Sequence, residues 1–117
     1  MDKIELEKRT KAFAIQVIRY VASLPKCKQS DVLGYQLLKA GTSIGANYRE
    51  ANRAESRADF VHKIAIVEKE AAETQYWLEL CRETGILNCD GLDELQRESS
   101  ELLAIFTSIG KTTKGRR

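Results

Sequence analysis

Side chains suited to acid–base or metal chemistry gather in the middle of the chain. Asp59 and His62 have the spacing Asp-x-x-His, and Glu70 and Glu73 follow three residues apart. Together with Glu50, this set is similar to the carboxylate and histidine ligands of di-metal helical bundles. Such a site requires a second histidine from another helix, and His62 is the only histidine in the chain. We therefore expect no metal site and no catalytic centre.

Other signatures of catalysis are missing from the sequence. The chain has no Gly-rich phosphate loop and no serine-nucleophile motif. Its cysteines, Cys27, Cys81 and Cys89, are odd in number and include no Cys-x-x-Cys pair, so we expect reduced thiols. The sequence predicts a protein that is not an enzyme and has no cofactor.

Arginine residues form a second candidate site. Arg49, Arg53 and Arg57 lie at positions i, i+4 and i+8, and would make one basic row if a single helix continued through all of them. The end of the chain adds further cations, at Lys111, Lys114, Arg116 and Arg117. Such side chains can hold nucleic-acid phosphates without reading bases. The alternative is a solvated helix surface neutralised by nearby carboxylates, and the sequence leaves both interpretations open.

A polar stripe accompanies two glycines just before the arginines. Ser43, Asn47 and Glu50 fall on one helix face, and Gly41 and Gly45 predict a close approach of another helix backbone. The stripe either binds a ligand or satisfies its own polar groups between packed helices. We favour the structural role, because buried polar groups are normally paired. We assign this role to Ser43, Asn47, Glu50, Glu70 and Glu73.

The elements that position these residues are helices. Apolar residues at helical spacing predict helices over residues 3–24, 31–54, 57–84 and 91–111. Pro25 ends the first helix, Ser30 or Asp31 caps the second, a capping box at Ser56 opens the third, and Gly85 closes it. Short connections favour an all-α, antiparallel up-and-down four-helix bundle. We expect one domain over residues 1–117, with residues 111–117 as a flexible basic tail.

Charge and hydropathy suggest partners. Residues 1–29 carry seven basic against three acidic side chains, whereas residues 85–110 carry one basic against five acidic. A molecule with basic and acidic segments can pair with its own copies or attract an anion.

Ile15, Ile18 and Ala22 form a second apolar stripe on the first helix, which indicates contacts beyond the monomer. No apolar run approaches the roughly 18 residues of a membrane span, so we expect a cytoplasmic protein without membrane contact.

Several short sequences in the second and third predicted helices have a recognisable arrangement. They are Ser43-Ile44, Asn47, Glu50-Ala51, Ser56, Phe60, Lys69-Glu70, Glu73-Thr74 and Tyr76-Trp77-Leu78. In these residues the chain resembles small bacterial four-helix-bundle proteins encoded in intervening sequences of large-subunit ribosomal RNA genes. The accessory variability protein of diversity-generating retroelements is related to that family. The resemblance implies an up-and-down bundle and a ring-like homopentamer. In the retroelement branch it also implies a positive surface that engages nucleic acid and a reverse transcriptase.

The sequence departs from the commonest family pattern at one corner. Ala51 and Ala54 stand where the pattern has a glycine and an arginine.

We interpret the chain as a non-catalytic, oligomeric module that binds RNA or a ribonucleoprotein partner. The alternative is a protein-binding scaffold that uses its apolar helix faces and binds no nucleic acid.

Overall fold

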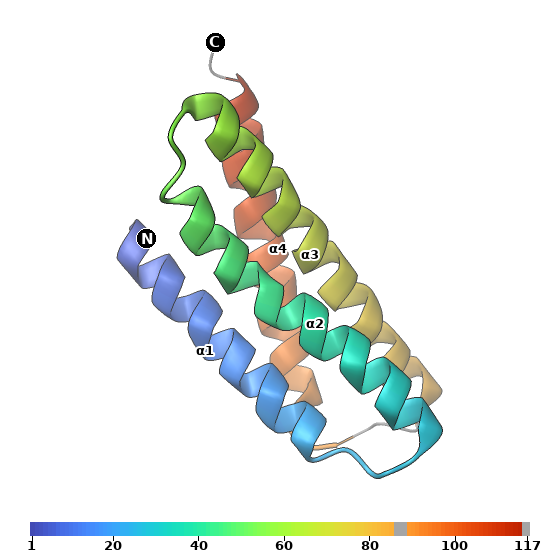
Figure 1. Ribbon diagram of the computed structural model, residues 1–117. Helices are drawn as coiled ribbons and strands as arrows, with labels where there is room; N and C mark the ends of the chain where they lie inside the picture. Colours follow the sequence, from blue (N-terminus) through green and yellow to red (C-terminus); the bar gives the residue numbers. More distant parts are fainter. Residues whose placement is uncertain (86–88, 116–117) are drawn as a thin grey trace.

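Four antiparallel helices make up the structure, a computed structural model that describes residues 1–85 and 89–115. The helices are α1 (Lys3–Ala22), α2 (Lys28–Ala51), α3 (Arg57–Thr84) and α4 (Leu92–Gly115). Each packs against its neighbour in the sequence, and α1 also contacts α4. The start of α1, the α2–α3 connection and the end of α4 meet at one end of the bundle (Figure 1). The predicted all-α four-helix bundle is confirmed.

The helix with the clearest local signals has the predicted bounds. Ser56 caps α3, because its side chain accepts a hydrogen bond from the Asp59 backbone N–H at 3.0 Å. Gly85 follows the last residue of α3 with a φ of 69°, in the left-handed region where glycine carries no steric penalty. The predicted helix over residues 57–84 is therefore confirmed at both ends.

The predicted bounds of the first two helices are wrong by a few residues. Helix α1 ends at Ala22 rather than residue 24, since Leu24 precedes Pro25 and is pushed out of the helical region. Helix α2 begins at Lys28 because Cys27, not Ser30 or Asp31, occupies the cap position, and its Sγ accepts from the Ser30 N–H at 3.5 Å. The same helix ends at Ala51 rather than residue 54.

Helix α4 begins one residue later than predicted, at Leu92, and continues to Gly115 rather than residue 111. Its last turns remain attached to the bundle: Gly110 is buried against the Glu68 side chain, and Arg57 donates a hydrogen bond to the Thr113 carbonyl. Lys111 and Lys114 therefore belong to a helix. Arg116 and Arg117 lie outside the described residues.

Helices α1 and α2 approach closely at two glycines. A Cβ atom added to Gly41 would lie 2.9 Å from Val17 Cγ2, and one added to Gly45 would lie 3.1 Å from Thr10 Oγ1. A side chain at Gly41 would force Val17 to shift, and one at Gly45 would require Thr10 to move by a few tenths of an ångström. The close approach predicted from the two glycines is present, and the partner helix is α1.

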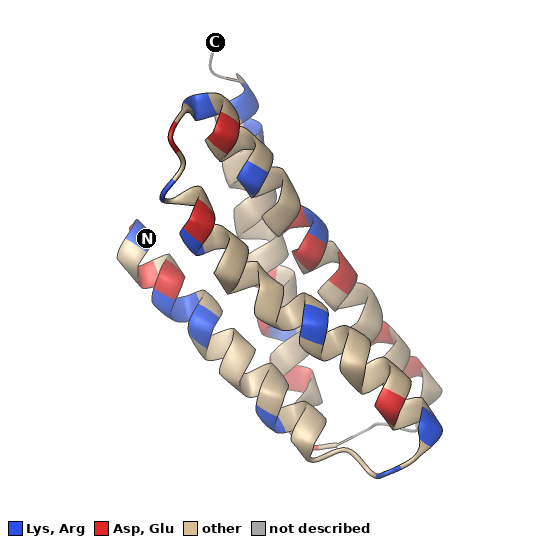
Figure 2. Ribbon diagram, in the orientation of Figure 1, with Lys and Arg blue, Asp and Glu red and all other residues tan. Residues whose placement is uncertain are grey.

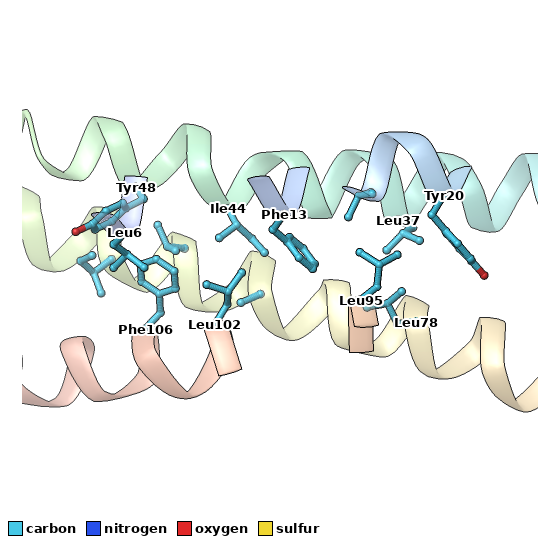
Figure 3. Packing of buried hydrophobic residues seen from close by; sticks show 14 of the residues in the cluster. Leu6, Phe13, Tyr20, Leu37, Ile44, Tyr48, Leu78, Leu95, Leu102 and Phe106 are labelled. Atoms are coloured by element: carbon cyan, nitrogen blue, oxygen red, sulfur yellow. The ribbon is translucent and has the colours of Figure 1, made fainter. Parts of the chain in front are cut away.

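Apolar side chains from all four helices fill the space between them (Figure 3). Phe13, Ile44, Leu78 and Phe106 are fully or almost fully buried, and the Phe106 and Tyr48 rings pack edge to face at 5.2 Å between centroids. Cys81 is also fully buried, and burial raises the pKa of its thiol. Among the described residues, no helix is long and apolar enough to cross a membrane. This core sets the rotation of each helix and so decides which charges face outward.

Candidate nucleic-acid interface

The three candidate arginines do not form one helical row. Arg49 lies in the last turn of α2, Arg53 lies in the α2–α3 connection, and Arg57 is the first residue of α3. The row required a helix that continues past residue 54, and α2 ends at Ala51. All three side chains are nevertheless exposed. The α2–α3 connection, around which they lie in the sequence, is at the end of the bundle that holds both termini (Figure 1).

Arg57 joins two helices at this end. Its guanidinium donates a hydrogen bond to the Thr113 carbonyl in the last turn of α4. Lys111 and Lys114 are exposed on the same terminal turns. The contact places Arg57 beside the predicted tail cations, while part of its hydrogen-bonding capacity is used within the fold.

A hollow between α1 and α2 carries cations that sequence reasoning missed. Its lining includes the small residues Ala14, Gly45 and Ala46, together with Lys11 from α1 and Arg49 from α2. The other lining residues are Glu7, Thr10 and Thr42. The hollow exists because α1 and α2 meet closely at Gly45. Because the residues between the two helices are small, α1 and α2 each contribute one cation, Lys11 and Arg49, to the same hollow.

The cations on this side are available to a partner. Lys8, Lys11, Arg49 and Arg53 are exposed, and within the described ranges none of them forms an ion pair. The carboxylate in the hollow is Glu7, which accepts a hydrogen bond from Asn52 Nδ2 at 2.9 Å. We call Lys8, Lys11, Arg49 and Arg53 the α1–α2 cationic face.

The opposite side of α1 has a different character. Arg9 Nε donates to Glu98 Oε2 at 2.6 Å, and Arg9 Nη2 donates to Glu101 Oε1 at 2.8 Å. These bonds raise the pKa of the guanidinium above its usual value. The hollow at this α1–α4 seam also contains Glu94 and Arg97. Its excess of carboxylates would repel phosphate, so the two sides of α1 differ in the ligands they can attract.

The polar stripe makes its contacts within the bundle. Ser43 Oγ donates to the Lys39 carbonyl at 2.6 Å, and Asn47 Nδ2 donates to the Ser43 carbonyl at 2.8 Å. Glu50 accepts from Lys63 Nζ at 3.0 Å across the α2–α3 seam. These bonds support the structural interpretation of the stripe over a ligand site.

Two further carboxylates of the predicted stripe lie on α3. Glu70 is half-buried and Glu73 is exposed. Burial raises the pKa of Glu70, the Glu73 charge adds to that effect, and Lys69 and Lys39 oppose it. Glu70 therefore has a weaker preference for the charged form than an exposed carboxylate has.

The Asp-x-x-His pair lies at the start of α3 and is not assembled into a ligand cluster. Asp59 participates in the helix cap, where its Oδ2 accepts from the Glu55 N–H at 3.4 Å, and His62 is exposed. Within the part of the chain that the structure describes, no three His, Cys, Asp or Glu side chains lie close enough together to hold a metal ion.

Comparison with known proteins places this geometry in a family. The model of the 23S rRNA-intervening sequence protein family matches residues 2–108. The chain belongs to the 23S rRNA-intervening sequence protein family. This family membership confirms the resemblance found in the sequence. The match includes the whole cationic face but ends before Lys111, so the terminal cations lie outside the region shared with the family.

A solved structure of related sequence has the same fold. It is the crystal structure of a protein of unknown function from the S23 ribosomal protein family of Bacteroides thetaiotaomicron. The two chains are 37% identical, the alignment covers 95% of this chain and 99% of the other, and the TM-score is 0.84. No curated protein matches the chain significantly. Neither the family description nor the structure's description refers to an enzyme.

Proposed function

We propose that this protein is a non-catalytic, homo-oligomeric module that binds RNA or a ribonucleoprotein through its α1–α2 cationic face. The observation that carries the proposal is that Lys8, Lys11, Arg49 and Arg53 are exposed without ion-pair partners in the described residues. Membership of a family named for 23S ribosomal RNA favours RNA over other anions. A cytoplasmic location belongs to the same proposal.

The shape of this surface suits the phosphate backbone. The hollow between Lys11 and Arg49 is lined by small side chains, and aromatic residues, on which bases stack, are absent from its described lining. Recognition then depends on charge and on the path of the RNA backbone. Each lost phosphate contact lowers the slope of the logarithm of the binding constant against the logarithm of the salt concentration by roughly 0.7 to 0.9. Arg57, Lys111 and Lys114 extend the positive surface toward the end of the bundle. Arg116 and Arg117 add two positive charges to the sequence that follows the described residues.

Oligomerisation would strengthen this weak surface. Four cations on one copy give modest affinity, whereas several copies held together gain apparent affinity without new contacts. The exposed Ile15 and Ile18 on α1 support self-association, and the resemblance implies a homopentamer. We therefore propose that the pentamer is the RNA-binding form.

The decisive experiment is a titration of the purified protein with a structured fragment of 23S ribosomal RNA at two salt concentrations. We expect binding that weakens steeply as salt rises, because released counterions drive it. Light scattering at micromolar protein should give the mass of five copies. A protein that binds no RNA at low salt would instead be a scaffold for protein partners, and a monomeric mass would remove the pentamer.

A further inference from the structure

A patch of exposed apolar side chains lies on α1 and α2, and on α1 it continues the stripe that also carries Lys8 and Lys11 of the cationic face. Ile15 and Ile18 of α1 are exposed, and Val32 and Tyr35 of α2 retain 54% and 62% of their accessible surface. All of them lie in the half of the bundle next to the α1–α2 connection (Figure 1). Large apolar residues grouped in this way indicate a surface that a partner covers.

The sequence of α1 explains how the patch arises. Leu6, Thr10, Phe13, Val17 and Tyr20 repeat in steps of four and three and are buried. A second stripe with the same steps starts at Ile4 and continues through Ile15, Ile18 and Ala22 on the opposite side of the helix. Lys8 and Lys11 occupy its intermediate positions. This heptad spacing is the one that lets a second helix pack along the first.

The charges around the patch are mostly positive. Arg19, Lys28 and Lys39 are exposed, and none of them forms an ion pair among residues 1–85 and 89–115. Asp31 is the exposed carboxylate on the same part of α2. A partner therefore needs apolar side chains flanked by acidic groups.

The outer face of α3 has that composition. Tyr76 is 53% exposed, and Ala72 and Leu80 lie one turn from it in either direction along the helix. The carboxylates on this face are Glu73, Glu79 and Glu83, which are exposed and make no ion pair with any described residue. Lys69 is an exposed cation on the same stripe, seven residues before Tyr76. Figure 2 shows the acidic positions along this half of α3.

We infer that the apolar patch on α1 and α2 of one copy packs against the outer face of α3 of the next copy. The inference rests on the homo-oligomer proposed above, and it names the two surfaces that meet. Pairing the α1–α2 patch with itself would place Arg19, Lys28 and Lys39 against their own copies, which like charges disfavour. Pairing with α3 matches apolar groups with apolar groups and cations with carboxylates.

The arrangement is head-to-tail, and it is compatible with a closed ring. Two different surfaces meet, so one contact leaves a free surface of each kind, and copies continue to add until the rotation closes. Both surfaces lie in the same half of the bundle, because the end of α1, the start of α2 and the end of α3 come together there (Figure 1). Successive copies therefore meet through the same half of the bundle.

Two variants and their mixture test the inference in full-length protein. Ile18→Asp places an acid opposite the α3 carboxylates, and Glu73→Lys/Glu83→Lys places cations opposite Arg19, Lys28 and Lys39. We expect each variant alone to be monomeric by light scattering, with unchanged helicity because the substituted side chains are exposed. Mixed together, they should form dimers, since the intact patch of one can still hold the intact α3 face of the other.

A charge exchange within one chain supplies the matching rescue. Adding Lys28→Glu/Lys39→Glu to the Glu73→Lys/Glu83→Lys chain reverses two charges on each surface, and we expect it to restore the wild-type mass. An oligomeric Glu73→Lys/Glu83→Lys variant would overturn the inference while leaving the oligomer intact. A monomeric wild type would overturn both. RNA titration of the wild type separates these results from a failure of RNA binding alone.

Discussion

Arg9 and Glu98 join α1 to α4 through two parallel hydrogen bonds, 2.6 Å from Nε to Oε2 and 2.7 Å from Nη2 to Oε1. About three quarters of each side chain is shielded from solvent. Paired geometry of this kind is stronger than a single surface ion pair. The pair bridges the two ends of the sequence, between helices that pack less extensively than α1 does on α2.

The first prediction concerns this pair. Glu98→Ala should lower the free energy of unfolding by about 1 kcal/mol, because part of the charge-assisted bond is lost while Glu101 still holds Arg9. Urea unfolding of Arg9→Ala, Glu98→Ala and the double variant gives the coupling energy. Effects of the single variants that simply add would show that the two side chains are not energetically coupled.

The second prediction concerns the close approach of α1 and α2. Gly45→Leu should destabilise the protein by about 1 to 3 kcal/mol, because the new side chain meets Thr10 Oγ1, Cβ and backbone carbon. Gly110→Ala is the matched control, since its Cβ meets only the end of the flexible Glu68 side chain, which can rotate away. Thermal unfolding should show a lower midpoint for Gly45→Leu alone. Equal midpoints for Gly45→Leu and the wild type would contradict the packing.

The third prediction concerns pH. Burial and the Glu73 charge raise the pKa of Glu70 above the ordinary 4.5, so folding favours its protonated form. This contribution is favourable below pH 4.5 and is lost as the pH rises through the raised pKa. Glu70→Gln should therefore be more stable than the wild type at pH 7, with a difference that shrinks as the pH falls through the raised pKa and is absent below pH 4.5. Urea unfolding across this range checks it; a difference independent of pH would argue against the assignment.

The fourth prediction concerns the cationic face. Arg49→Ala/Arg53→Ala should weaken binding to every RNA sequence about equally and lower the salt slope by roughly 1.5, since two phosphate contacts are lost. Lys8→Ala/Lys11→Ala should behave in the same way. Lys26→Ala/Arg97→Ala removes two exposed cations elsewhere and should leave the slope almost unchanged. If all three double variants lost affinity equally, net charge rather than this face would be responsible.

Parts of the fold could be predicted because their signals are local. Ser56 and Gly85 fix both ends of α3 through their own side chain and backbone, so the sequence alone was sufficient. The start of α2 depends on a sulfur atom as a cap, and Cys27 is not a residue that capping preferences favour. The end of α4 depends on distant residues, Glu68 and Arg57, which no local pattern reveals.

The candidate site could also be predicted only in part from the sequence. Arg49, Arg53 and Arg57 could be named from their spacing, but their arrangement depended on where α2 ends. Lys11 was missed because its relation to Arg49 requires knowing that α1 packs on α2 at Gly45. The signal was present in the two glycines, which indicated a partner helix without identifying it. Assigning α1 as that partner would have brought Lys11 into the site, together with Lys8 one turn before it on α1.

The reaction of the buried Cys81 thiol with thiol reagents can measure how often the helix bundle opens. Its raised pKa and full burial should keep it unreactive toward thiol reagents while the helices are closed. Cys27 is the internal standard, because it is half-buried at the surface and Ser30 lowers the pKa of its thiol. The labelling rate of Cys81 relative to Cys27 then measures how often the packed end of α3 becomes exposed. If a neighbouring copy packs on the outer face of α3, the relative labelling rate of Cys81 should fall as protein concentration rises.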